Sequence, residues 1–146
     1  MEWYQEGNEI KFRPIKEKAS YEDISCQLFY NRTAWYINNW SNICQLTARG
    51  CYYQPNNCTS KKQAEKLLAI NQLMNVAKYL NNGWQPNWND SDEFKYYFNI
   101  VSGKVLIPRT VVNHYSIVYF KSEKLAQQAI EILGEEIIKL AFSTDW

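Results

Sequence analysis

This sequence of 146 residues contains only five glycines, four prolines and one histidine, and its formal net charge is +1. The scarcity of glycine and proline excludes a low-complexity or disordered chain. No apolar run approaches the roughly 18 residues that span a bilayer, so a soluble protein is expected. The balanced charge argues against a general nucleic-acid binder, which carries a marked basic excess. The first residues lack the basic and apolar regions of a secretory signal, and a cytoplasmic protein is therefore expected.

Motifs that identify common reactions and cofactors are also missing. The chain has no glycine-rich phosphate loop, no strained-serine elbow and no His-Glu-x-x-His pair. His114 is the only histidine, and a catalytic role would need a cysteine or a carboxylate beside it in a cleft. The segment Asn89–Glu93 lacks the central glycine of a calcium loop, and we interpret it as a solvated turn. The sequence predicts a protein without enzymatic activity, metal or cofactor.

The four cysteines do not have the spacing of a metal site. Structural zinc sites draw their ligands in pairs two to four residues apart, and no Cys-x-x-Cys pair occurs here. We interpret the cysteines as thiols in a reducing cytoplasm, with a zinc site or disulfides as the alternatives. Cys51 and Cys58, on either side of a Gln54–Asn57 turn, are the first pair to test for an interaction.

Residues 1–58 are expected to form a β-rich section. The pattern over residues 3–12 predicts a hairpin around Glu6-Gly7-Asn8. Ser20 and Asp23 have the spacing of a capping box and predict a helical turn, although residues 26–30 also fit a strand. Further strands are expected at residues 33–37, 43–47 and 51–54, with turn signals on either side of Trp40.

Residues 59–146 are expected to form a helix, a strand meander and a final helix. Ser60 and Gln63 are typical of a helix start, and Asn82-Gly83 is typical of a helix end. The apolar stripe of this helix is Leu67, Ile70, Leu73, Met74, Ala77 and Leu80. Its width leaves room for a homodimer through the helix from Lys61 to Asn82.

Alternating residues predict three antiparallel strands at 95–101, 104–112 and 114–120. Ser102-Gly103 is typical of a hairpin turn, and Pro108 belongs at an edge or a bulge. Ser122 begins a final helix that Gly134 interrupts, with a short helical piece at 135–142. We predict one α+β domain over residues 1–146, with the helices packed on one face of a three-stranded meander.

Aromatic residues are unusually abundant, and 11 of the 23 lie in the first 58 residues. That is too many for a small core, so some are expected on a recognition surface. Two tryptophans on the loop Trp84-Gln85-Pro86-Asn87-Trp88 either contact a partner or lock the helix end onto the sheet. The predicted partner-binding residues are Trp3, Tyr30, Arg32, Trp35, Tyr36, Trp40, Arg49, Tyr52, Tyr53, Trp84 and Trp88.

Four segments follow one another in a distinctive order: Gln63–Leu73, Gly83–Trp88, Lys95–Tyr97 and Tyr119–Gly134. This set resembles small, uncharacterised proteins of bacteriophages and other mobile elements in gut bacteria. The resemblance covers the chain from about Ala64 onward and carries no specific chemistry. It implies an accessory protein that blocks a host defence system, such as a CRISPR nuclease, in the cytoplasm of a bacterial host.

Two hypotheses about function follow. The first is a non-enzymatic inhibitor that binds a Cas effector, or its RNA complex, through the aromatic N-terminal section. The second is a protein that binds a small ligand or nucleotide, with aromatic rings stacked on the base and Arg32, Arg49 or Arg109 holding phosphate. The second hypothesis predicts a concave aromatic pocket with an arginine inside.

Overall fold

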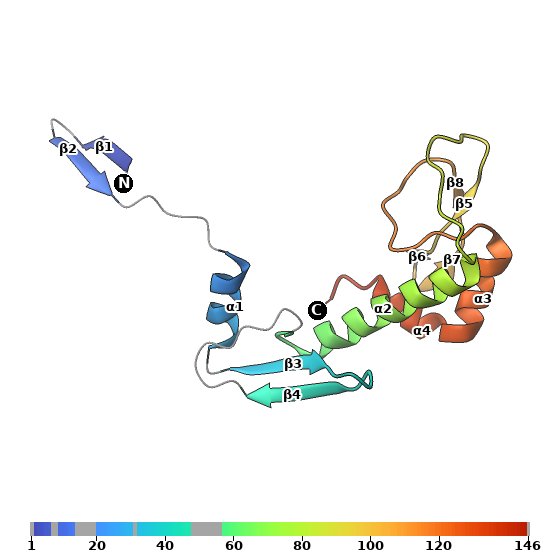
Figure 1. The fold of residues 1–146 in the computed structure, drawn as a ribbon, viewed down its shortest axis with the longest axis horizontal. Coiled ribbons are helices and arrows are strands. Elements are labelled where there is room, and N and C mark those ends of the chain that lie inside the picture. The colour runs from blue at the N-terminus through green and yellow to red at the C-terminus, as the bar shows by residue number, and fades with distance from the viewer. Residues whose placement is uncertain (1, 7–8, 14–19, 31, 48–56, 146) are drawn as a thin grey trace.

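The computed structural model describes residues 2–6, 9–13, 20–30, 32–47 and 57–145. Helices and short antiparallel strands are both present, which confirms the predicted α+β class. No helix within these ranges is long and apolar enough to cross a bilayer. The elements, labelled in Figure 1, are β1 (Glu2–Glu6), β2 (Glu9–Arg13), α1 (Tyr21–Phe29), β3 (Thr33–Ile37), β4 (Ile43–Thr47), α2 (Lys61–Asn81), β5 (Lys95–Tyr96), β6 (Asn99–Val101), β7 (Lys104–Leu106), β8 (Arg109–Thr110), α3 (Glu123–Leu133) and α4 (Glu135–Ala141).

Two antiparallel hairpins occupy predicted positions in the first part of the chain. β1 pairs with β2, and β3 pairs with β4 so that Trp35 lies opposite Gln45. Between the hairpins, Ser20 and Asp23 form the predicted capping box, because each side chain accepts the backbone N–H of the other residue. Of the two alternatives for residues 26–30, the helix is confirmed up to Phe29. The predicted strand at 51–54 lies outside the described residues.

The helix α2 begins and ends as its sequence predicts. The Ser60 hydroxyl accepts the backbone N–H of Gln63 at 3.0 Å. The Gln63 side chain accepts the N–H of Thr59 rather than that of Ser60, so the reciprocal bond is shifted by one residue. At the other end, Asn82 adopts the left-handed conformation with φ 44°, which terminates the helix.

The predicted apolar stripe of α2 is wrong at two positions. Leu67 and Met74 are 43% and 52% exposed, while Ala64 and Ala69 are buried in their place. The physical reason is that α2 packs against α3 and α4, and small alanine side chains let neighbouring helices approach closely. Leu67 and Met74 therefore lie on an outer face of α2, and a homodimer through this helix stays a prediction.

The predicted three-stranded meander is replaced by two short strand pairs. β6 and β7 form the expected hairpin around Ser102-Gly103, where both residues have positive φ, and β5 pairs with β8. The third strand is wrong: within residues 114–120 only Phe120 pairs, through an isolated bridge to Tyr96. The reason is that the Tyr119 hydroxyl accepts the backbone N–H groups of His114 and Ser116. These groups are therefore not available to pair with a neighbouring strand.

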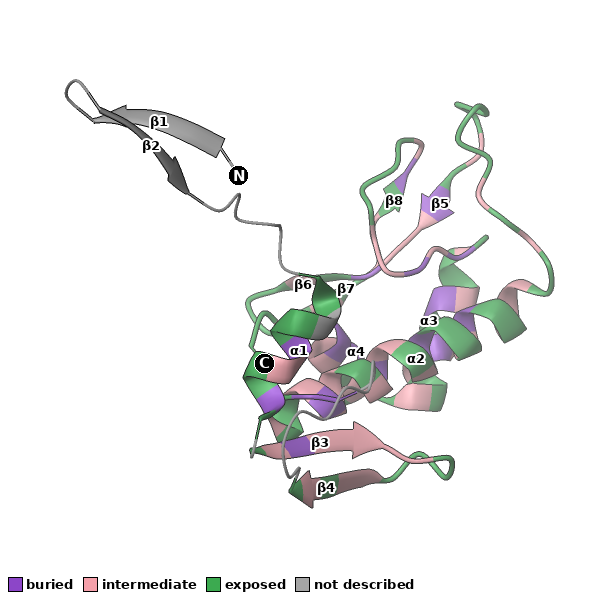
Figure 2. Ribbon diagram, turned by 60° about the vertical axis from the view of Figure 1, so that its left-hand side comes forward, coloured by how far each residue is buried: buried purple, intermediate pink, exposed green. Residues whose placement is uncertain are grey.

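The core lies between the helices and the strand segments of the second half. Its buried residues come from α2, α3 and α4 and from the strand region, namely Ala69, Leu73, Ala77, Phe98, Val118, Phe120, Ala126, Ala129, Ile138 and Ala141. The helices pack mainly against one another, with α4 touching β7, rather than side by side on a sheet (Figure 2). β3 and β4 lie near the start of α2, and β5 and β8 lie near its end (Figure 1).

Candidate functional site

The turn between β3 and β4 presents Trp40 to solvent. Its side chain is 81% exposed. The Asn38 carboxamide oxygen accepts the backbone N–H groups of Trp40 and Asn42, each at 3.0 Å, and Ser41 takes a left-handed conformation with φ 61°. The sequence predicted turn residues around Trp40. The structure shows how they fix the backbone of the turn that carries this exposed ring.

The helix α1 carries an exposed apolar face. Tyr21, Ile24 and Leu28 recur at steps of three and four residues and are 56%, 43% and 42% exposed. Ser25 and Phe29, on another face, are buried. Tyr30 directly follows the helix and is 58% exposed. The first section of the chain thus exposes large apolar side chains from both α1 and the Trp40 turn, as the count of aromatic residues predicted.

The other predicted residues of this section are less accessible or not described. Arg32 is exposed, whereas Trp35 and Tyr36 are half-buried in β3. Trp35 also forms an isolated bridge with Cys58, which ties β3 to the start of α2. The side chain of Trp3, which lies in β1, and the residues Arg49, Tyr52 and Tyr53 lie outside the described part of the structure.

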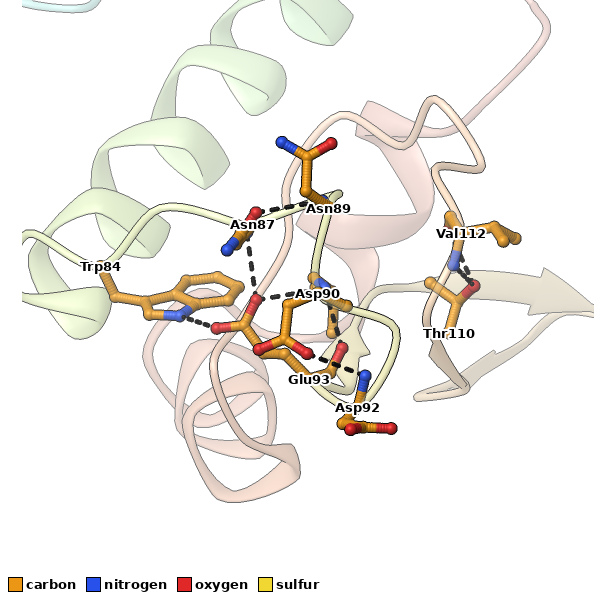
Figure 3. Close-up of polar contacts among 9 residues, drawn as sticks. Trp84, Asn87, Asn89, Asp90, Asp92, Glu93, Thr110 and Val112 are labelled. Carbon is orange, nitrogen blue, oxygen red and sulfur yellow. Dashed lines mark hydrogen bonds and ion pairs between the residues drawn. The ribbon is translucent and has the colours of Figure 1, made fainter.

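A carboxylate that the sequence did not single out holds the Trp84 loop (Figure 3). The indole N–H of Trp84 donates to one oxygen of Glu93 at 2.9 Å, and the backbone N–H of Asn87 donates to the other at 3.0 Å. The segment Asn89–Glu93 is therefore more than the solvated turn we predicted, because its last residue anchors the preceding loop.

Lys95 completes this network from a fully buried position. Its side chain is 0% exposed, and its Nζ lies 3.1 Å from a Glu93 carboxylate oxygen. It also donates to the backbone carbonyls of Glu93 and Asp90 and lies 5.2 Å from the centre of the Trp88 ring. Trp88 in turn packs edge-on against Tyr119. Both loop tryptophans make contacts within the molecule. This favours the alternative in which they hold the helix end against the rest of the fold over the one in which they contact a partner.

The Glu93 network makes a prediction about pH. The hydrogen bond from Trp84, followed by those from Asn87 and Lys95, lowers the pKa of Glu93 below its ordinary 4.5. Because the folded chain binds this proton less readily than the unfolded chain, the stabilisation is complete above pH 4.5 and is lost as the pH falls through the lowered pKa. We expect the urea midpoint to decline more steeply below pH 4.5 for the wild type than for Glu93→Gln.

The matched control for this experiment is Glu131→Gln, which changes an exposed carboxylate on α3. Its midpoint should follow the wild-type curve. A Glu93→Gln curve parallel to that of the wild type would show that the network contributes nothing to the acid sensitivity of folding.

A pocket lies at the end of α2. It has a volume of about 690 Å³. Rings of Tyr79, Trp84 and Tyr119 line it together with Met74 and Lys78, and no arginine is among its lining residues. Arg109 instead lies over the ring of Phe94, 4.3 Å from its centre. The aromatic pocket exists, but none of the described arginines lines it as the nucleotide hypothesis requires.

His114 is engaged by aromatic neighbours. Its ring stacks on that of Tyr97 at 5.4 Å, and its backbone N–H donates to the Tyr119 hydroxyl. In the part of the chain that the structure describes, no cluster of histidine, cysteine and carboxylate residues can hold a metal ion. The described contacts of His114 support a packing role.

The prediction that all four cysteines are thiols is wrong for Cys26. This residue is disulfide-bonded. Connectivity of this kind cannot be derived from cysteine spacing alone. Cys44 and Cys58 carry thiols, and burial raises the pKa of the Cys58 thiol. The possible interaction of Cys51 with Cys58 falls on a residue that the structure does not describe.

Sequence reasoning also missed Tyr115, whose side chain is 90% exposed on the chain between β8 and α3. The alternation of residues 114–120 placed it in a strand. Asn113 before it and Ser116 after it are turn-forming residues that could have indicated a loop.

The described residues thus offer two kinds of feature, exposed aromatic side chains on fixed turns and an aromatic pocket without arginine. Neither carries the residues of a known reaction. Comparison with protein-family models, curated proteins and solved structures finds no match to this chain.

Proposed function

We propose that this chain is a non-enzymatic inhibitor that binds a defence protein in the cytoplasm of a bacterial host. The target proposed first is a CRISPR effector or its RNA complex, as implied by the resemblance to proteins of mobile elements. The binding surface is the exposed apolar face of α1 with Tyr30 and the Trp40 turn, which we call the aromatic surface.

The observation that supports this proposal is the presentation of Trp40. Tryptophan is enriched among the residues that dominate binding energy at protein interfaces. A free tryptophan side chain on a flexible loop would lose conformational entropy on binding, but here the Asn38 carboxamide already fixes the backbone of the turn. The turn closes the β3–β4 hairpin, which gives its backbone bonds a role in folding, but burial gives no reason for the 81% exposed ring that it carries.

The alternative, a nucleotide-binding protein, has weaker support. Recognition of phosphate needs a cation or an array of backbone N–H groups in the pocket. The pocket at the end of α2 offers Lys78, but it lies where backbone carbonyls, not N–H groups, end the helix. Its aromatic rings alone do not select a nucleotide over another apolar ligand.

A plaque assay tests the proposal. The wild-type chain, expressed in a panel of CRISPR-bearing hosts, should protect phages that those hosts otherwise restrict. Trp40→Ala should weaken binding to the target by about 30-fold, as expected for an aromatic side chain that dominates an interface, and protection should fall accordingly.

Tyr79→Ala is the matched control, because Tyr79 is 79% exposed but lies on α2, outside the aromatic surface. This variant should protect phages as well as the wild type. Absence of protection in every host would overturn the proposed target, and equal losses in the two variants would overturn the proposed surface.

A further inference from the structure

We propose that residues 111–117, the Tyr115 loop, form a second binding surface that inserts the Tyr115 ring into an apolar pocket of a protein. This surface is separate from the aromatic surface and is carried by different elements. In Figure 1 it belongs to the chain between β8 and α3, near the end of α2, whereas the β3–β4 hairpin lies near the start of that helix.

The backbone of Tyr115 is strained. Its φ is 55°, in the left-handed region that bulky side chains rarely adopt, and its side chain is 90% exposed. Strained residues persist only where the surrounding structure imposes them, and they concentrate at functional sites. The ring obtains almost no burial in exchange for the strain, so folding alone gives no reason for a tyrosine at this position.

Three side chains impose this conformation through backbone N–H groups. The Thr110 hydroxyl accepts from Val112 at 3.0 Å and donates to the carbonyl of the same residue (Figure 3). The Asn113 carboxamide oxygen accepts the N–H of Tyr115 at 2.7 Å. The Tyr119 hydroxyl donates to Asn113 and accepts two further N–H groups of the loop. Four amides of the loop are thereby fixed before any partner arrives, which lowers the entropic cost of binding.

The chemistry of the loop favours a protein as its partner. Residues 110–120 contain no lysine, arginine, aspartate or glutamate. A nucleic-acid surface would need cations, whereas the centres of protein interfaces are depleted of charge and enriched in tyrosine. Tyrosine beside asparagine and serine is also the composition of antibody loops, in which rigid rings supply contact area and small polar residues supply hydrogen bonds. Val112, 59% exposed, adds apolar area beside the ring.

The experiment uses the full chain with the photoreactive amino acid p-benzoylphenylalanine at position 115, expressed in the same panel of hosts. Position 132 is the control, since Ile132 is 57% exposed on the regular helix α3 and does not line the pocket that Ile117 of the loop shares with Tyr79. Light should link position 115 to one protein that position 132 does not capture. Peptide mapping should place the link in an apolar concavity of that protein.

Binding assays with the purified captured protein then test the roles of the Tyr115 ring and of the fixed loop separately. Tyr115→Ala should weaken binding by about 100-fold, and Tyr115→Phe should change it by less than about threefold. Tyr119→Phe removes the hydroxyl that fixes the loop but keeps Tyr115, and we expect a loss of about tenfold. Ile132→Ala should bind like the wild type.

Three results would overturn the proposal. The first is a link to phospholipid, a link to nothing, or equal capture from positions 115 and 132. The second is unchanged binding by Tyr115→Ala. The third is a clear fall in the urea midpoint for Tyr115→Gly, because glycine tolerates the positive φ and relief of strain should raise the midpoint. Because the readout is a cross-link, it does not depend on protection of phages, and the two proposals can fail separately.

Discussion

Lys95→Met should lower the free energy of unfolding by about 1–3 kcal/mol, which is the cost of leaving buried hydrogen-bonding groups without a partner, because Lys95 is buried whereas Glu93 is 28% exposed. Methionine fills a similar volume but donates no hydrogen bond. The change leaves the carbonyls of Asp90 and Glu93 without the donor that they have in the wild type. It also removes the cation from beside the Trp88 ring. Urea unfolding followed by circular dichroism measures the loss.

The matched variant is Lys104→Met, which makes the same change at an exposed lysine of β7. Exposed substitutions of this kind alter the free energy of unfolding by about 0.5 kcal/mol or less. Similar midpoints for the two variants would mean that the buried ammonium contributes no more than a surface one. A selective loss at Lys95 would show that the loop from Trp84 to Glu93 is held in place by the lysine beneath it.

Phe120→Ala should cost about 3–5 kcal/mol, the range for deleting a large aromatic side chain from a core. Phe120 is 0% exposed and packs against the Phe98 ring, with 5.3 Å between their centres. Its backbone forms the bridge to Tyr96. On either side of Phe120, the Asn81 side chain donates to the carbonyl of Tyr119 and accepts the N–H of Lys121. Asn81 at the end of α2 therefore holds the backbone on both sides of Phe120. This segment cannot move inward to fill the cavity that the substitution creates.

Phe94→Ala provides the comparison for Phe120→Ala. Phe94 is 44% exposed, and the guanidinium of Arg109 lies over its ring. Loss of an exposed cation–π contact costs about 0.5–1 kcal/mol. If Phe94→Ala proved as damaging as Phe120→Ala, the assignment of the core to the interior of the helix cluster would be wrong.

The elements that were predicted correctly have boundaries fixed by neighbours in the sequence. Ser20, Ser60 and Ser122 each accept a backbone N–H three residues ahead, and Gly134 ends α3 with a φ of 84°. The hairpin at Ser102-Gly103 likewise depends on two adjacent residues with positive φ. Such interactions are visible in a single sequence because both partners lie within one turn of chain.

The predictions that failed depended on partners distant in sequence or on side chains that compete with the backbone. Alternation placed residues 95–101 in one strand but did not indicate that Lys95 is buried as fully as Phe98, because the burial of Lys95 depends on the folded loop that pairs it with Glu93. The third strand was lost because the Tyr119 hydroxyl takes amides that a ladder would need. Among candidate binding residues, exposure of Trp40 followed from its turn signals, whereas the engagement of Trp84 and Trp88 required the loop to be seen in three dimensions.

All buried members of the core cluster lie between Ala69 and Ala141, so α1 and the β3–β4 hairpin stand outside it. Segments with fewer buried contacts open at a lower free energy than the core does. Backbone amide hydrogens in α2, α3 and α4 should therefore exchange with water mainly when the whole cluster unfolds, and those of β3 and β4 through smaller, earlier openings. Among the tryptophans whose side chains the structure describes, the most exposed is Trp40, on the part expected to open earlier. A bound partner would slow hydrogen exchange there while leaving the helices nearly unchanged.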